Sequence, residues 1–231
     1  MHIALDCCFT LKRLKKPQDV PISLSDSNFI PKSKVDEAQR LVEEHRKKNP
    51  RSKPFKMHEK HYAGCEESFK ATDENRKKAN ATLFDDTGLM AGTCRHGVVL
   101  FAVNMNTPGE RQHYAIAVLR ELLEHLPHET KIGVLYDIGC NLEKGCIKWD
   151  YLGEALEFFD FAVSIFHAYG HRWECQLVYN PRKRKGFALT DGEACERIWS
   201  QLKFLISVCR VSGVSFPVFV QILTSRPLTV N

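Results

Sequence analysis

The arrangement of apolar and polar positions predicts short buried strands along the chain. Ile3 to Leu11 is an apolar stretch with one carboxylate, Asp6, near its middle, which is typical of a buried strand. Gly88 to Thr93 and Val98 to Val103 are two further apolar runs, and the polar turn between them predicts an antiparallel hairpin. Lys131 to Asp137 is another apolar run, and it ends on a carboxylate. The sequence therefore places single acids within or at the end of strands.

Helical spacing appears between and after these strands. From Glu110 to Leu126 the apolar residues fall on one helical face, namely Tyr114, Ala117, Val118, Leu122, Leu123 and Leu126. A short helix is expected from Glu154 to Phe159, a strand from Phe161 to Phe166, and a last helix from Asp191 to Val208, capped by Asp191. The order of elements predicts an α/β fold, with an RNase H-like mixed sheet flanked by helices.

Residues 17–85 differ in character from the rest. Five prolines interrupt this segment, large apolar residues are sparse, and only Lys34 to Lys48 shows weak helical periodicity. We interpret 17–85 as a long insertion after the first strand, mostly on the surface.

Composition narrows the class of protein. A net charge of +5 permits nucleic-acid binding without requiring it. No run of 18 apolar residues occurs and the first residues do not resemble a signal peptide, so we expect an intracellular protein with no membrane partner. Nine cysteines, an odd number, argue against a disulfide framework. Basic residues cluster at Arg182, Lys183, Arg184 and Lys185, where the alternatives are a solvated surface and a DNA-binding patch.

The strand carboxylates are candidate ligands for Mg²⁺ or Mn²⁺. An acid such as Asp6 or Asp137 in an apolar strand is unfavourable unless it is paired or metal-bound. Glu193 and Glu196 lie three residues apart on the last expected helix and so share a face. Taken singly, each acid could be a turn former or a helix-dipole partner. Together with the topology, they favour a site for two-metal phosphoryl transfer.

Cysteine and histidine residues form a second candidate set. Cys94 and His96 are closely spaced, and His167, His171 and Cys175 follow one another at intervals of four, with Cys65 as a further candidate. Sulfur and imidazole ligands suit Zn²⁺. The alternatives are buried core thiols and histidines, or a role for His167 and His171 in holding the metal-site carboxylates or touching phosphate.

Several of these strings resemble a known family of transposases. The residues that carry the likeness are Asp85 to Met90, Thr93 to His96, Asn104, Thr107 to Glu110, Leu135 to Cys140, Phe166 to His171, Asn180 to Lys183 and Asp191 to Ser200. Together they resemble the Kyakuja–Dileera–Zisupton (KDZ) class of DNA transposases, from about Ile3 to Gly213. No single string is specific, but the set is.

The resemblance implies a DDE-type RNase H-like core over 1–213 that cleaves and transfers DNA strands with Mg²⁺. It implies Asp6 and Asp137 as catalytic acids, and Glu193 or Glu196 as the third, with Glu193 preferred. It also implies a nuclear location, transposon ends and target DNA as partners, and a homo-oligomer if functional. The likeness stops before 214–231, an unrelated tail typical of a truncated copy, so an inactive relic is one expectation.

Three hypotheses follow. The first is an active or relic DDE transposase. The second is a non-catalytic module derived from one, which binds DNA or protein through the basic insertion and 182–185. The third is a structural zinc protein in which the acids are incidental.

Overall fold

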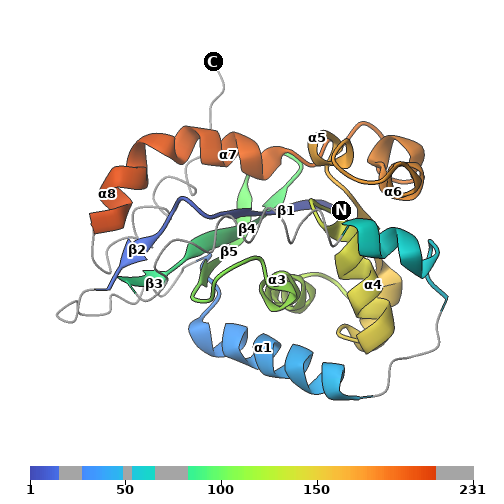
Figure 1. Cartoon of the computed structure of the whole chain (residues 1–231), viewed down its shortest axis with the longest axis horizontal. Helices are drawn as coiled ribbons and strands as arrows, with labels where there is room; N and C mark the ends of the chain where they lie inside the picture. Colours follow the sequence, from blue (N-terminus) through green and yellow to red (C-terminus); the bar gives the residue numbers. More distant parts are fainter. Residues whose placement is uncertain (16–27, 49–53, 66–82, 212–231) are drawn as a thin grey trace.

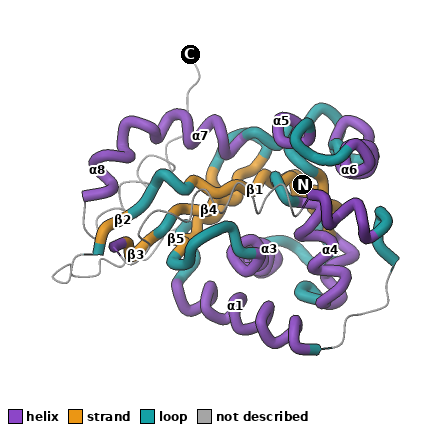
Figure 2. The backbone as a smooth tube through the Cα atoms, in the orientation of Figure 1, coloured by secondary structure: helices purple, strands orange, loops and turns teal. Residues whose placement is uncertain are grey.

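A computed structural model describes residues 1–15, 28–48, 54–65 and 83–211. Its centre is a five-stranded mixed sheet with the strand order β5-β4-β1-β6-β7. Helices cover both faces of this sheet, as Figures 1 and 2 show. The fold is therefore mixed α/β, as predicted, and the strand order is consistent with an RNase H-like arrangement.

The sheet is built outward from its N-terminal strand. β1 (His2–Cys8) lies in the middle, antiparallel to β4 (Gly88–Cys94) and parallel to β6 (Ile132–Tyr136). β5 (Val99–Met105) extends one edge as the antiparallel partner of β4, and β7 (Phe159–Ala162) extends the other as the parallel partner of β6. A separate small sheet pairs β2 (Arg13–Leu14) with β3 (Phe84–Asp86).

Residues of β1 alternate between two cores. Ile3 and Leu5 belong to the larger apolar cluster on one face, whereas Ala4 and Cys8 belong to the smaller cluster on the other. This alternation is the period of two that a strand imposes on its side chains. Asp6 shares the parity of Ala4 and Cys8, so its side chain faces the second core.

Different helices cover the two faces (Figure 1). On the larger core lie α3 (Gln112–His125) and α4 (Gly139–Trp149), with α1 (Lys32–Lys47) packed against α3. On the other face lie α7 (Ala194–Leu202) and, after the 3-10 turn Lys203–Leu205, α8 (Ile206–Val211). The 3-10 turn Gly153–Phe158 leads into β7. The chain then forms α5 (Ile165–Ala168), α6 (Trp173–Tyr179) and the 3-10 turn Pro181–Lys183.

Some expected elements differ from the structure. The strand predicted over Phe161 to Phe166 is β7, which ends at Ala162, and the chain has entered α5 by Ile165. α4 and α6 were not predicted at all. The last helix begins at Ala194 rather than Asp191 and is interrupted by a 3-10 turn.

The described pieces of the insertion are amphipathic rather than purely superficial. Val35, Ala38 and Val42 of α1 are buried in the larger core, and so are Tyr62 and Cys65 from the helix over residues 59–65. Many neighbouring side chains in these pieces are exposed. The rest of the insertion and the predicted tail over 214–231 lie outside the described residues.

In the described part of the chain, no helix combines the length and the apolar character that crossing a lipid bilayer requires.

Candidate functional site

Five carboxylates from separate segments line one large cavity, called here the acid cavity. Its volume is about 1570 Å³, and its acids are Asp6 of β1, Glu43 of α1, Glu110 before α3, Asp137 at the end of β6 and Glu196 of α7. Because β1 and β6 are parallel neighbours, their acids emerge at the same side of the sheet. The topology thus brings together acids that are far apart in the sequence.

Asp6 is held in place by hydrogen bonds to both of its carboxylate oxygens. The indole Nε1 of Trp199 donates to Oδ2 at 2.6 Å, and the backbone N–H of Cys7 donates to Oδ1 at 2.6 Å. Only 8% of Asp6 is exposed to solvent. These donors fix the carboxylate without neutralising it.

Asp137 is linked to Glu196 through a histidine. Nδ1 of His167, on α5, lies 3.1 Å from Oδ2 of Asp137, and its Nε2 lies 3.7 Å from Oε1 of Glu196. The ring therefore spans the gap between two cavity acids. This placement matches the alternative in which His167 holds the carboxylates rather than a zinc ion.

The acids of the cavity repel one another. Burial, followed by the charges of Glu110 and Glu196, raises the pKa of Asp6 well above its ordinary value. Burial also raises the pKa of Asp137, and the charges of Asp6, Glu110, Glu193 and Glu196 add to the effect. A cation among these oxygens would relieve the repulsion.

The two candidate glutamates of the last helix have different surroundings. Glu193 occupies the N-cap position of α7, and its Oε1 accepts a hydrogen bond from the backbone N–H of Phe166 at 2.8 Å. Glu196 lines the cavity, whereas Glu193 does not. Within the structure, Glu196 is therefore better placed than Glu193 to join Asp6 and Asp137.

Glu110 is a cavity residue that was not predicted as part of a site. Burial, followed by the charge of Glu110, raises the pKa of the Cys7 thiol and of the Tyr136 hydroxyl. The sequence offered only a weak signal, because Glu110 stands at the boundary between a turn and a helix, where glutamate is common.

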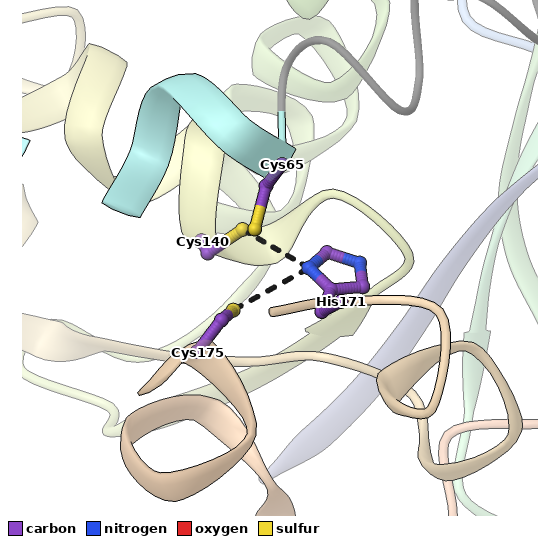
Figure 3. A group of neighbouring side chains, drawn as sticks. All are labelled: Cys65, Cys140, His171 and Cys175. Carbon is purple, nitrogen blue, oxygen red and sulfur yellow. Dashed lines mark hydrogen bonds between the residues drawn. The ribbon is translucent and has the colours of Figure 1, made fainter. Parts of the chain in front are cut away.

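A second group of potential ligands lies beside the acid cavity and is called here the Cys/His group. It consists of Cys65, Cys140, His171 and Cys175, whose ligand atoms all lie within 4.8 Å of one another. Nδ1 of His171 is 3.6 Å from Sγ of Cys140 and 3.4 Å from Sγ of Cys175 (Figure 3). All four residues are buried. This Cys3His group could bind a metal ion such as zinc.

Hydrogen bonding among the sulfurs favours one thiolate. Contacts with Cys140 and then Cys175 hold the pKa of Cys65 well below its usual range. Contacts with Cys175 and Cys65 raise the pKa of Cys140. A thiolate is the form of cysteine that binds metal.

The Cys/His group differs from the set expected from spacing. His171, Cys175 and the further candidate Cys65 are brought together, and Cys140 joins them without having been predicted. Cys94 and His96 lie elsewhere, at the β4–β5 turn, with Sγ of Cys94 3.8 Å from Nδ1 of His96.

A glycine allows Cys140 to reach this position. Gly139 begins α4, and a Cβ there would collide with the carbonyl oxygen of Ala162 in β7. The close contact sets the start of α4 against the end of β7, so Cys140 lies over the sheet edge beside Asp137.

A comparison with models of protein families identifies the family of this chain. The model of the Kyakuja-Dileera-Zisupton (KDZ) transposase family matches residues 1–216, nearly the whole chain. The chain belongs to the KDZ transposase family. Comparisons with curated proteins and with solved structures returned no match.

KDZ membership makes the chain a transposase-derived protein and suggests that it binds DNA. The expected basic cluster is only partly available for such contacts. Arg184 donates hydrogen bonds to the carbonyl of Phe161 and to Asp160, and its guanidinium stacks over Tyr179 and Phe187. Arg184 is therefore part of the fold.

The other members of the basic cluster point outward. Arg182, Lys183 and Lys185 are exposed. In this KDZ protein, further basic residues line the acid cavity itself, namely Lys12, Arg46, Arg111 and Lys203. Positive charge thus surrounds the carboxylates.

Proposed function

We propose that the chain is a DDE-type transposase core that cleaves and transfers DNA strands at the acid cavity. One observation carries the proposal: five acids from separate segments line one cavity of a KDZ family member. Asp6, Asp137 and Glu196 are the proposed catalytic acids. Glu110 is a neighbouring acid that adds to the charge of the site.

The donors in the cavity fit Mg²⁺ or Mn²⁺. The three proposed catalytic acids offer carboxylate oxygens, which are the ligands that Mg²⁺ prefers, and the cavity leaves room for retained waters. The mutual repulsion that raises the pKa of Asp6 and Asp137 is the electrostatic condition that a cation would relieve. Mg²⁺ bound there supplies the charge stabilisation that phosphoryl transfer requires.

Neighbouring side chains orient the acids. Trp199 fixes Asp6 through its indole N–H, and His167 fixes Asp137 while reaching toward Glu196. A site whose first ligands are held by surrounding contacts needs less rearrangement to bind a cation. These two residues are therefore proposed as positioning residues.

DNA is the proposed substrate, as transposon ends and as target. Lys12, Arg111 and Lys203 could contact phosphates on either side of the acids, with Arg182, Lys183 and Lys185 as an outer patch. A nuclear location and a homo-oligomeric active form complete the proposal, in keeping with a transposase that acts on chromosomal DNA.

The test is metal-dependent nicking of a supercoiled plasmid by the purified chain. With Mg²⁺ or Mn²⁺, the wild type and an Asp36→Asn control, whose acid pairs with Lys32 on the surface of α1, are expected to nick. Asp137→Asn is expected to lose roughly a thousandfold in rate.

Two other outcomes would contradict the catalytic proposal. If Asp137→Asn nicks as fast as the wild type, the activity lies elsewhere. If no protein nicks, but the wild type binds DNA with an affinity that falls steeply with salt, the chain is a non-catalytic DNA-binding module.

A further inference from the structure

We infer that Cys65, Cys140, His171 and Cys175 form a zinc site that joins the helix over residues 59–65 to the core. The inference does not depend on DNA cleavage, because it concerns a different set of ligands. It also departs from the set predicted from the sequence, because it keeps Cys65, His171 and Cys175 but adds Cys140 and leaves out Cys94, His96 and His167.

The separations within the group suit a tetrahedral ion. Zinc bonds of about 2.3 Å to sulfur and about 2.0 Å to nitrogen would place sulfur and nitrogen roughly 3.5 Å apart. The two sulfur-to-Nδ1 distances are 3.6 Å from Cys140 and 3.4 Å from Cys175. Both distances match the separation expected around zinc, and all four ligand atoms lie within 4.8 Å of one another.

The group is complete and closed. Three sulfurs and one imidazole make a Cys3His set, and the exposed fraction of these residues is between 0% and 7%. Structural zinc sites use four protein ligands and leave no open position, unlike catalytic sites. This set predicts a structural ion and not a second catalytic centre.

The ligands come from three separate segments (Figure 3). Cys65 ends the helix over residues 59–65, Cys140 is in the first turn of α4, and His171 and Cys175 flank the start of α6. Cysteines that cluster only because they are apolar and buried would not require a histidine ring among them. Here the His171 ring lies between the sulfurs, with Nδ1 directed at two of them.

Contacts around the group keep the insertion close to the core. The hydroxyl of Tyr62 is hydrogen-bonded to that of Tyr179 at 2.7 Å, and Tyr179 donates to Oε2 of Glu143 at 2.6 Å. Lys56 donates to Oε1 of the same Glu143 at 2.6 Å. These bonds surround the Cys/His group from the side of residues 54–65, so metal binding would complete an existing junction.

The side chain of Arg172 packs closely against Gly64, next to the ligand Cys65. A Cβ on Gly64, next to Cys65, would collide with the side chain of Arg172, which follows His171. The absence of a side chain at Gly64 thus lets the end of the helix approach the loop that carries His171. The short helix is docked where its cysteine meets the other three ligands.

The first experiment measures the metal content of the full chain expressed with zinc. About one zinc ion per chain is expected in the wild type, and substantial loss in Cys140→Ser and Cys175→Ser. Cys146→Ser is the matched control, because Cys146 is a buried cysteine of α4 outside the group. Cys94→Ser tests the set that the spacing suggested.

Cobalt substitution keeps the inference testable if a serine variant fails to fold. Wild-type chain loaded with Co²⁺ should show the sulfur-to-cobalt charge-transfer band and the visible bands of tetrahedral cobalt. His171→Cys should retain the ion and strengthen the charge-transfer band. A wild type without zinc and without these bands would overturn the inference, as would zinc that survives Cys140→Ser but is lost in Cys94→Ser.

Discussion

The acid cavity and the Cys/His group are neighbours built for different tasks. The two sites are close in sequence: Asp137 and Cys140 are three residues apart, and His167 and His171 are four residues apart. One site is an open cavity of charged oxygens that repel one another, and the other is a buried set of sulfurs and one imidazole. Carboxylate oxygens suit Mg²⁺, which we propose for the first site, and a set of sulfurs with one imidazole suits Zn²⁺, which we infer for the second.

If both proposals hold, one region of the fold carries a catalytic site and a stabilising metal site side by side. Acids held under electrostatic strain are unfavourable for the metal-free fold. A closed metal site within a few residues can offset that loss by fixing the same backbone. We expect the two sites to respond differently to metal removal, mutation and pH.

The largest expected effect is on stability when zinc is removed. A chelator strong enough to strip zinc should lower the free energy of unfolding by roughly 5 kcal/mol or more, since zinc binding is coupled to folding in small metal domains. Omitting Mg²⁺ should have little effect on the same measurement. Urea unfolding followed by circular dichroism would measure both, and equal sensitivity to the two ions would break the comparison.

The next effect separates the two glutamates of the last helix. Glu196→Gln should slow plasmid nicking by about a hundredfold or more, because it removes a proposed metal ligand, roughly 3 kcal/mol in the barrier. Glu193→Gln should slow nicking much less, since Glu193 does not line the cavity. Both variants should keep their zinc. A larger loss with Glu193→Gln would restore the preference for Glu193 that the family resemblance implied.

A histidine in the cavity wall should make stability depend on pH. Burial, followed by the charge of Arg111, lowers the pKa of His113 from 6.5 to about 4, with Arg46 acting in the same direction and Glu43 and Asp36 opposing. Between about pH 6.5 and about pH 4, His113 is therefore protonated in the unfolded chain but neutral in the folded chain. Stability from neutral His113 is full above about pH 6.5 and is lost as pH falls toward about 4.

Substitution of that histidine tests the sign. His113→Phe should reduce the loss of unfolding free energy between about pH 7 and about pH 4.5 by on the order of 1–3 kcal/mol. His96→Phe, at the exposed β4–β5 turn, is the control and should leave the slope unchanged. An unchanged slope for His113→Phe would mean that His113 is readily protonated in the fold.

The smallest expected effect concerns the orientation of Asp6. Trp199→Phe removes the indole donor to Oδ2 and should slow nicking about tenfold, roughly 1.4 kcal/mol. Its signature is a raised Mg²⁺ requirement with zinc retained. Trp149→Phe, on α4 and outside the cavity lining, is the matched control. Equal effects of the two variants would remove the positioning role of Trp199.

Much of the sheet could be predicted because its strands are locally distinct. β1, β4, β5 and β6 are short apolar runs, and a turn joins β4 to β5, so pattern alone locates them. α4 was not predicted because Gly139, Asn141 and Gly145 are weak helix formers, and the helix is stabilised by packing against the sheet. The strand expected up to Phe166 was too long because Ile165 and Phe166 are apolar but begin α5.

The two sites were foreseeable to different degrees. Asp6 and Asp137 are acids in apolar strands, a contrast that is visible in the sequence. The Cys/His group is only partly local: the spacing of His171 and Cys175 is visible in the sequence, but long stretches of chain separate Cys140 from the other ligands, so no spacing indicates it. Cys94 and His96 were predicted as ligands because they are close in sequence, but they lie outside the Cys/His group.

The central position of β1 has a consequence for how the chain reaches its fold. β1 pairs Ile3 with Cys94 on one side and Ala4 with Leu135 on the other, so both partners lie far along the sequence. Such non-local pairing slows folding, because long loops must close before any strand contact is gained. On the ribosome, the apolar surfaces of β1 must wait until both partners have emerged, which makes the nascent chain a natural client for chaperones.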